Sequence, residues 1–71
     1  KIIKAHPPKE LQNQKLKDLD IRRRFSINII GIKKKTGSSY NFDMAPGGDT
    51  ILSHEDIIIA AGKEEDITKL F

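Results

Sequence analysis

The chain has 71 residues, no cysteine and a formal net charge of +3. A domain of this size lies near the lower limit for one hydrophobic core, and without cysteine it has neither a disulfide nor a thiolate metal site to support it. Association with a second copy is the expected remaining support. No apolar run approaches the roughly 20 residues of a membrane span, and no signal-peptide pattern is present. The start at Lys1 without a methionine suggests a piece of a longer protein.

The N-terminal part predicts an edge strand followed by one helix. Residues 1–6 are short and mixed in character, and the Pro7-Pro8 pair ends this strand because consecutive prolines remove backbone donors. From Leu16 to Phe25 apolar residues recur at same-face helical spacing. We therefore expect a helix over residues 14–24.

A β-hairpin is expected next. Residues 27–35 are a β-branched run with apolar side chains on both faces, which is typical of a strand covered on both sides. Simple alternation places Ile32 on the same face as Asn28. Residues 36–39 have turn composition, and apolar and polar residues alternate over 40–44, which predicts a second strand with one wet face.

The C-terminal part predicts a central strand and a final helix. Residues 56–62 predict a buried strand: the apolar residues after Asp56 show no alternation, which suits a central position, and Gly62 closes the strand. Residues 63–71 predict a short helix whose first turn holds the acidic cluster 64–66. The helix dipole favours negative charge there, so we interpret the cluster as capping rather than catalytic.

Two basic clusters, residues 22–24 and 33–35, are candidates for binding an anion. We interpret the second as solvated surface. The first lies at the helix-to-strand junction, and the planar fork of arginine suits phosphate oxygens. Asn28 follows closely, among isoleucines, and its amide needs partners. It is either a satisfied cross-strand asparagine or a ligand contact, and both alternatives stay open.

Other chemistries find little support in the sequence. His6 and His54 lie far apart and match no metal-ligand spacing, so we expect no metal site. No nucleophile context is present, and the glycines at 47 and 48 belong to a turn rather than a phosphate loop. The four aromatic residues occupy core-like positions rather than a stacking platform. We therefore predict no enzyme, no cofactor and no nucleic-acid partner.

Three ordered motifs resemble a known family. They read Leu16-x-x-Leu-Asp-Ile-Arg-x-x-Phe-x-Ile-Asn-Ile-Ile-Gly-Ile-Lys, then after the hairpin Pro46-x-x-Asp-Thr-Ile-Leu, and finally Asp56-Ile-Ile-Ile-x-x-Gly-x-x-Glu-Asp. Together they resemble the C-terminal domain of RCK/TrkA proteins (RCK_C), which regulate potassium conductance, and most of all the KtrA-type subunits of potassium uptake systems. The resemblance covers residues 11–71.

The resemblance implies an α+β fold over residues 1–71, with a small mixed sheet, a β-hairpin and two to three short helices, paired as a twofold homodimer. It also implies a cytosolic regulatory domain that binds cyclic di-AMP in the dimer interface and modulates gating of a membrane potassium transporter subunit. Such a domain would be peripheral to the inner face of the cell membrane. The family's ligand site maps onto Ile21, Arg22, Asn28 and Ile29. The alternatives are a ligand-free dimerisation module and a domain that senses divalent cations.

Overall fold

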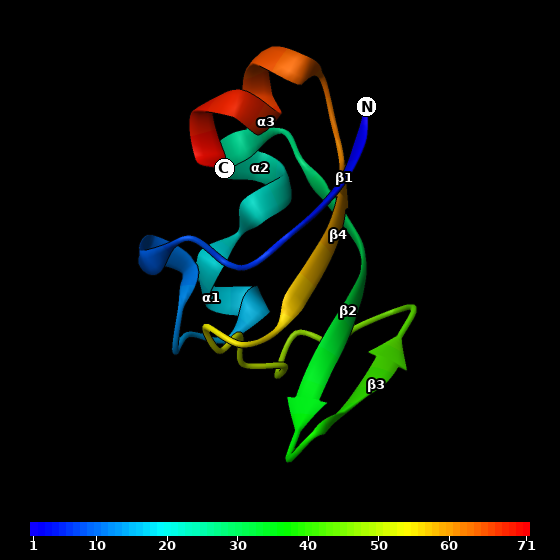
Figure 1. Ribbon diagram of the computed structural model, residues 1–71. Coiled ribbons are helices and arrows are strands. Elements are labelled where there is room, and N and C mark those ends of the chain that lie inside the picture. Colours follow the sequence, from blue (N-terminus) through cyan, green and yellow to red (C-terminus); the bar gives the residue numbers. More distant parts are fainter.

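The computed structural model describes residues 1–71 as one sheet of four strands with short helices on one side of it (Figure 1). The fold is α+β, as expected from the sequence. None of its helices combines the length and the apolar character that crossing a membrane requires. The elements in chain order are β1 (Ile2–Ala5), the 3-10 helix η1 (Lys9–Leu11), α1 (Leu16–Leu19), α2 (Ile21–Phe25), β2 (Asn28–Thr36), β3 (Ser39–Asp43), β4 (Ile57–Ala61) and α3 (Glu64–Leu70).

The strand order is β1-β4-β2-β3, and every neighbouring pair is antiparallel. The expectation of a mixed sheet was therefore wrong. β1 and β2 do run in the same direction, because both are antiparallel to β4, but β4 lies between them and separates them. The predicted edge strand at the N-terminus, the hairpin and the central C-terminal strand are all confirmed.

The core lies between the inner face of the sheet and the helices. Ile32 and Ile58 pair across β2 and β4 on this inner face, and neither is exposed. α3 adds two buried side chains, and the predicted acidic cluster does occupy its first turn. The buried cluster comprises Leu11, Leu19, Ile21, Ile27, Ile32, Leu52, Ile58, Ala60, Ile67 and Leu70.

A β-bulge in β2 changes which side chains reach the core. Asn28 and Ile29 oppose successive residues of β4, but the next pair begins at Gly31, so Ile30 is an extra residue in β2. The extra residue reverses the alternation. Ile32 consequently lies on the same inner face as Ile29, and its predicted placement with Asn28 was wrong.

The predicted single helix over residues 14–24 is divided into α1 and α2. Asp20 lies between them with φ 48° and ψ 47°, the left-handed conformation that aspartate tolerates better than most residues. The Arg24 guanidinium donates to the Leu19 carbonyl (3.1 Å), which satisfies an acceptor at the break. The left-handed conformation of Asp20 therefore interrupts the helix, and α1 and α2 are two separate short helices.

Asp56 ties the loop before β4 to β2. Its side chain is fully buried and accepts hydrogen bonds from Lys34 Nζ (2.6 Å), the Lys35 N–H (3.0 Å) and the Ser53 N–H (2.9 Å). Burial alone would raise the pKa of this carboxyl, but the hydrogen bonds, led by that of Lys34, hold the pKa below its ordinary value. Lys34 is thus the partner of a buried carboxylate. The interpretation of residues 33–35 as solvated surface was therefore wrong for Lys34.

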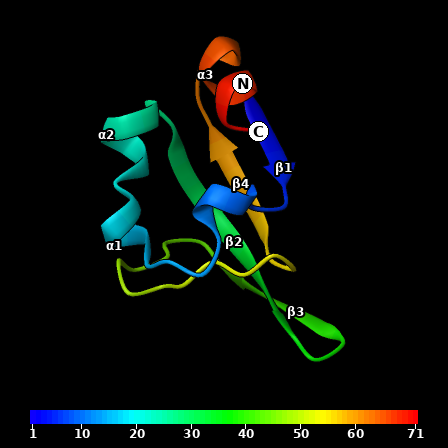
Figure 2. The same ribbon diagram turned by 90° about the vertical axis from the view of Figure 1, so that its left-hand side faces the viewer.

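The hairpin of β2 and β3 extends beyond the helices and leaves its outer face uncovered (Figure 2). Gly37 forms its turn with φ 63°. Phe42 lies against Gly31 yet is 54% exposed, and Met44 just after β3 is 64% exposed. The apolar side of the hairpin therefore faces solvent as well, together with Ile2 of β1 at 67% exposure.

Candidate ligand-binding site

An open hollow of about 340 Å³ lies where α1 and α2 meet the start of β2. We call it the junction hollow. The structure brings all four site residues predicted from the sequence to its wall, from two different elements: Ile21 and Arg22 from α2, and Asn28 and Ile29 from β2. Its full lining comprises Leu16, Lys17, Asp20, Ile21, Arg22, Ile27, Asn28 and Ile29.

The floor of the junction hollow is apolar. Ile21 and Ile27 are members of the buried core, so they form the base of the hollow rather than reach out of it. Leu16 and Ile29 are only partly buried and pack against that core. A flat apolar group placed here would therefore cover mainly Leu16 and Ile29, whereas Ile21 has little exposed surface to offer.

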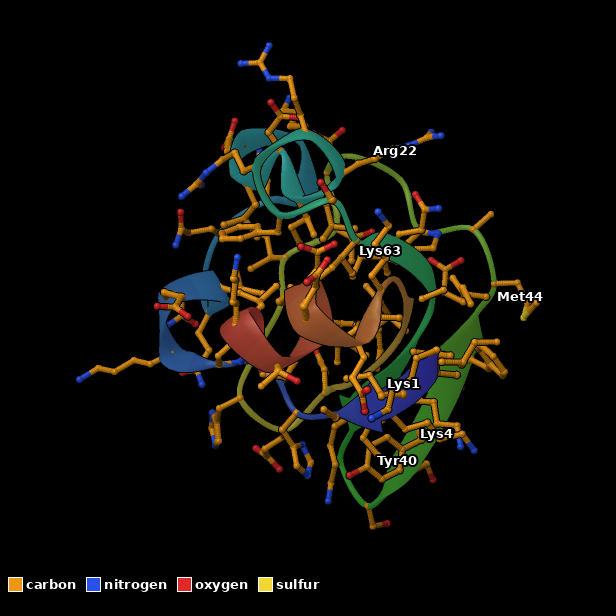
Figure 3. All side chains as sticks on the ribbon, turned by 90° about the horizontal axis from the view of Figure 1, so that it is seen from above. Lys1, Lys4, Arg22, Tyr40, Met44 and Lys63 are labelled. Atoms are coloured by element: carbon orange, nitrogen blue, oxygen red, sulfur yellow. The ribbon has the colours of Figure 1, made fainter.

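Arg22 is the only one of the three consecutive arginines that has no partner within the chain. Arg23 Nε lies 3.1 Å from Asp20 Oδ2, and the Arg24 guanidinium bonds the Leu19 carbonyl and lies 4.9 Å from the centre of the Phe25 ring. No hydrogen bond or ion pair engages the exposed side chain of Arg22, which projects away from α2 (Figure 3). One free guanidinium thus stands at the hollow.

Asn28 is exposed, and the side-chain amides that form hydrogen bonds within the chain are those of other residues, Gln12, Gln14 and Asn41. The cross-strand partner considered for it is not present. Asn28 is also the first residue of β2, and β3 pairs only with the part of β2 from Ile32 to Thr36. The edge of β2 next to the hollow is consequently unpaired, and the amide of Asn28 is free to bind a ligand.

Lys17 and Asp20 line the junction hollow but were not among the predicted site residues. Lys17 Nζ lies 3.1 Å from Asp49 Oδ1, and Asp20 is paired with Arg23. Lys17 lies four residues before Ile21, and Asp20 lies directly before it. Because residues four apart share a helix face, this spacing was the signal in the sequence that could have placed Lys17 near Ile21. The break at Asp20 and the contact with Asp49 could not be derived from that spacing.

The histidines lie away from this hollow. His6 Nδ1 is 2.9 Å from the carbonyl oxygen of Asp56, and His54 Nε2 is 3.8 Å from Glu55 Oε1 on an exposed turn. No group of three or more histidine and acidic side chains gathers anywhere in the structure. The junction hollow itself combines a cationic group, an amide and an apolar floor. Such a lining suits an anionic ligand with flat apolar parts.

The structure resembles solved RCK C domains. The RCK C domain of the potassium transport protein KtrA, solved in complex with cyclic diadenosine monophosphate (c-di-AMP), is 32% identical; the match covers 96% of this chain and 75% of that one, with a TM-score of 0.78. The RCK_C domain dimer of S. agalactiae BusR in complex with c-di-AMP (16% identity, 94% and 86% coverage, TM-score 0.77) shares the fold. So does the GsuK channel bound to NAD (16% identity, 97% and 12% coverage, TM-score 0.76).

The sequence of the chain was compared with curated proteins and with protein families. No curated protein sequence matches this chain. The family model for the TrkA-C domain matches residues 2–71, which is nearly the whole chain. The family resemblance inferred from the sequence motifs is confirmed: the chain belongs to the TrkA-C family of RCK C regulatory domains.

Proposed function

We propose that this domain regulates a potassium transport system by binding cyclic di-AMP in the interface of a twofold homodimer, and so modulates gating of a membrane transporter subunit. The observation that carries the proposal is the convergence of Arg22, Asn28 and Ile29 on one hollow, with the guanidinium and the amide both free of partners. The 32% identical KtrA domain was solved with this ligand, which supports the same choice here.

The symmetry of the ligand matches the proposed assembly. Cyclic di-AMP has two equivalent halves, so a site on a twofold axis lets each subunit make the same contacts with one half. Each phosphate would meet one copy of Arg22, which binds phosphate oxygens through a charge-assisted fork, and Asn28 would add polar contacts. Leu16 and Ile29 would cover the adenines.

The dimer itself has support from the uncovered apolar surface. Ile2, Phe42 and Met44 are all more than half exposed, and a small chain without cysteine gains stability when a second copy covers such residues. In the view from above, Arg22 and Met44 project on the same side of the molecule (Figure 3). A second copy placed over this side would cover the apolar surface, and the two copies together would enclose the ligand.

Regulation would work through populations of dimer geometries. A ligand that touches both subunits favours the geometry in which both half-sites fit, by no more than its difference in affinity for the two geometries. The chain would act at the cytoplasmic face of the membrane without catalysis, cofactor or nucleic acid. The S. agalactiae BusR protein has been solved with its promoter DNA, but at 16% identity that match concerns the fold alone.

The test is calorimetric titration of the chain with cyclic di-AMP, with Arg22→Ala and Arg23→Ala compared. Both substitutions remove one exposed arginine from the same helix, but only Arg22 lines the hollow. Arg23 acts on the hollow only through its exposed ion pair with Asp20, and such a pair contributes little. A charge-assisted hydrogen bond contributes about 1.5–3 kcal/mol, and Arg22→Ala removes one such bond from each of the two half-sites, so it should weaken binding by roughly 150-fold or more. Arg23→Ala should stay within about threefold, and the stoichiometry should be one nucleotide per two chains. Equal affinities for both variants would remove Arg22 from the site.

A ligand-free dimerisation module is the second candidate, because the exposed apolar face needs a partner whether or not a nucleotide binds. A thermal-shift screen separates it from the first. Cyclic di-AMP at about 100 times its dissociation constant adds about 2.7 kcal/mol, which raises the Tm of a domain this small by roughly 10–20 °C. A dimer whose Tm responds to no cyclic dinucleotide, no mononucleotide and no divalent cation would support the ligand-free module instead. A response to calcium alone would indicate cation sensing.

A further inference from the structure

Lys17 is held at the rim of the junction hollow by the loop between β3 and β4. Its backbone N–H donates to the Gly48 carbonyl (2.9 Å), and the Leu16 N–H donates to the Thr50 carbonyl (2.9 Å). The Gly48 backbone lies so close that a Cβ at that position would be 3.1 Å from the Lys17 Cβ. The base of the Lys17 side chain is therefore fixed beside the hollow, while its ammonium group is free to reorient.

The carboxylate that holds this ammonium group is shared between two lysines. Asp49 Oδ1 lies 3.1 Å from Lys17 Nζ and 3.8 Å from Lys15 Nζ. The Asp49 side chain is 81% exposed and that of Lys17 56%, so water screens both pairs and each holds weakly. Two ammonium groups facing one carboxylate leave one positive charge uncompensated. Lys17 can leave Asp49 while Lys15 still neutralises it.

The remaining charges around the hollow favour an anion near Lys17. The only acidic side chain in the lining is Asp20, and Arg23 already pairs with it at 3.1 Å. Lys17 and Arg22 are the two cationic members of the lining. An anion inside the hollow would thus have one guanidinium without any partner and one ammonium group with a weak, shared partner.

We infer that Lys17 is a second cationic contact for the phosphate of the bound nucleotide, and that it exchanges Asp49 for this phosphate while Lys15 keeps Asp49. This inference rests on the proposed function, because it assigns a further contact to the same site. It makes the loop that carries Asp49 part of the response to ligand, since binding removes one of the two ion pairs that hold that loop to α1.

The experiment is a calorimetric titration with cyclic di-AMP of the unsubstituted chain and three variants. Lys17→Gln should weaken binding about 100-fold, because it removes one charge-assisted contact, worth about tenfold, from each of the two half-sites. Lys15→Gln is the matched control, because it removes a lysine from the same carboxylate but not from the hollow, and its affinity should stay within about twofold. Asp49→Asn should tighten binding by about threefold, because Lys17 then has no carboxylate to leave. Thermal unfolding of each variant checks that all four proteins are equally folded.

The outcomes separate this inference from the proposed function. If Lys17→Gln binds as tightly as Lys15→Gln while Arg22→Ala still binds weakly, the role of Lys17 is refuted and the site stands. If both lysine substitutions weaken binding equally, the effect is general attraction to a positive surface, and the inference fails as well. If the unsubstituted chain binds no cyclic di-AMP, both proposals fall.

Discussion

Replacing Asp56 by asparagine should strongly destabilise the domain although the two side chains have nearly the same shape. The carboxylate accepts Lys34 Nζ and the Ser53 N–H at one oxygen and the Lys35 N–H at the other. An asparagine amide has a single acceptor oxygen, so in either orientation its NH2 group opposes at least one of these donors. A buried donor loses its partner, and the ammonium group of Lys34 loses its counter-charge.

The size of the effect follows from this geometry. Removing one partner of a buried ion pair destabilises by about 3–5 kcal/mol. Lys34 is 35% exposed and can turn partly to water, so the lower end, about 3 kcal/mol, applies. For a domain of 60–100 residues each kcal/mol shifts the Tm by about 4–8 °C, so Asp56→Asn should lower it by roughly 12–24 °C. Asp49→Asn is the control, since that carboxylate also faces lysines but is exposed, and its Tm should change by only about 2 °C.

The pH dependence gives an independent check of the same carboxylate. The pKa of Asp56 is lowered in the folded state, so the carboxylate contributes stability above the ordinary aspartate pKa of about 3.9 and loses it as the pH falls through the lower folded value. Thermal unfolding by circular dichroism at pH 7 and pH 3 should therefore show a Tm gap between the original chain and Asp56→Asn that narrows on acidification. A gap of the same size at both pH values, or a variant as stable as the original at pH 7, would refute this account of Asp56.

Two further substitutions probe the hairpin and the proposed dimer. Gly37→Ala should lower the free energy of unfolding by about 1–2 kcal/mol, measured as a lower Tm, because position 37 has φ 63° and open space around it, so that only the backbone conformation opposes the new Cβ. Gly37→Asn should lower it less, because asparagine tolerates this conformation better. Equal losses for the two variants would argue against this reason. Met44→Asp should weaken dimerisation in sedimentation equilibrium by placing a charge on the exposed apolar side, whereas Met44→Leu should preserve it. A dimer unaffected by Met44→Asp would exclude Met44 from the interface.

The sequence predicted the elements whose signals are local. The run after Asp56 lacks alternation because side chains on both faces of β4 are buried, as Ile58, Ile59 and Ala60 show. The mixed run 1–6 is an edge strand. The tight turn composition of 36–39 matches the Gly37 turn. In each case the residues that determine the element are neighbours in the chain, so the local residue pattern was sufficient to predict that element.

The errors all concern contacts between distant residues or single backbone torsions. Asp20 adopts a left-handed conformation that its residue type permits but does not require. The bulge at Ile30 depends on the register between β2 and β4, which no local pattern specifies. Lys34 looks like its two lysine neighbours in sequence, and only the approach of the buried Asp56, 22 residues later, gives its ammonium group a partner inside the fold.

The convergence on the junction hollow was predictable for a simple geometric reason. α2 ends at Phe25, and its C-cap Ser26 has φ 59° and an N–H that donates to the Arg22 carbonyl. Only Ser26 and Ile27 separate α2 from β2. So short a reversal leaves Asn28 no freedom to lie far from the first turn of α2. What the sequence could not provide is the choice among three identical arginines. That choice comes from the break at Asp20, because it supplies a carboxylate for Arg23 and a carbonyl for Arg24 and leaves only Arg22 free to bind a ligand. The break at Asp20, which makes the prediction of a single helix wrong, is therefore also what leaves one lining cation without a partner.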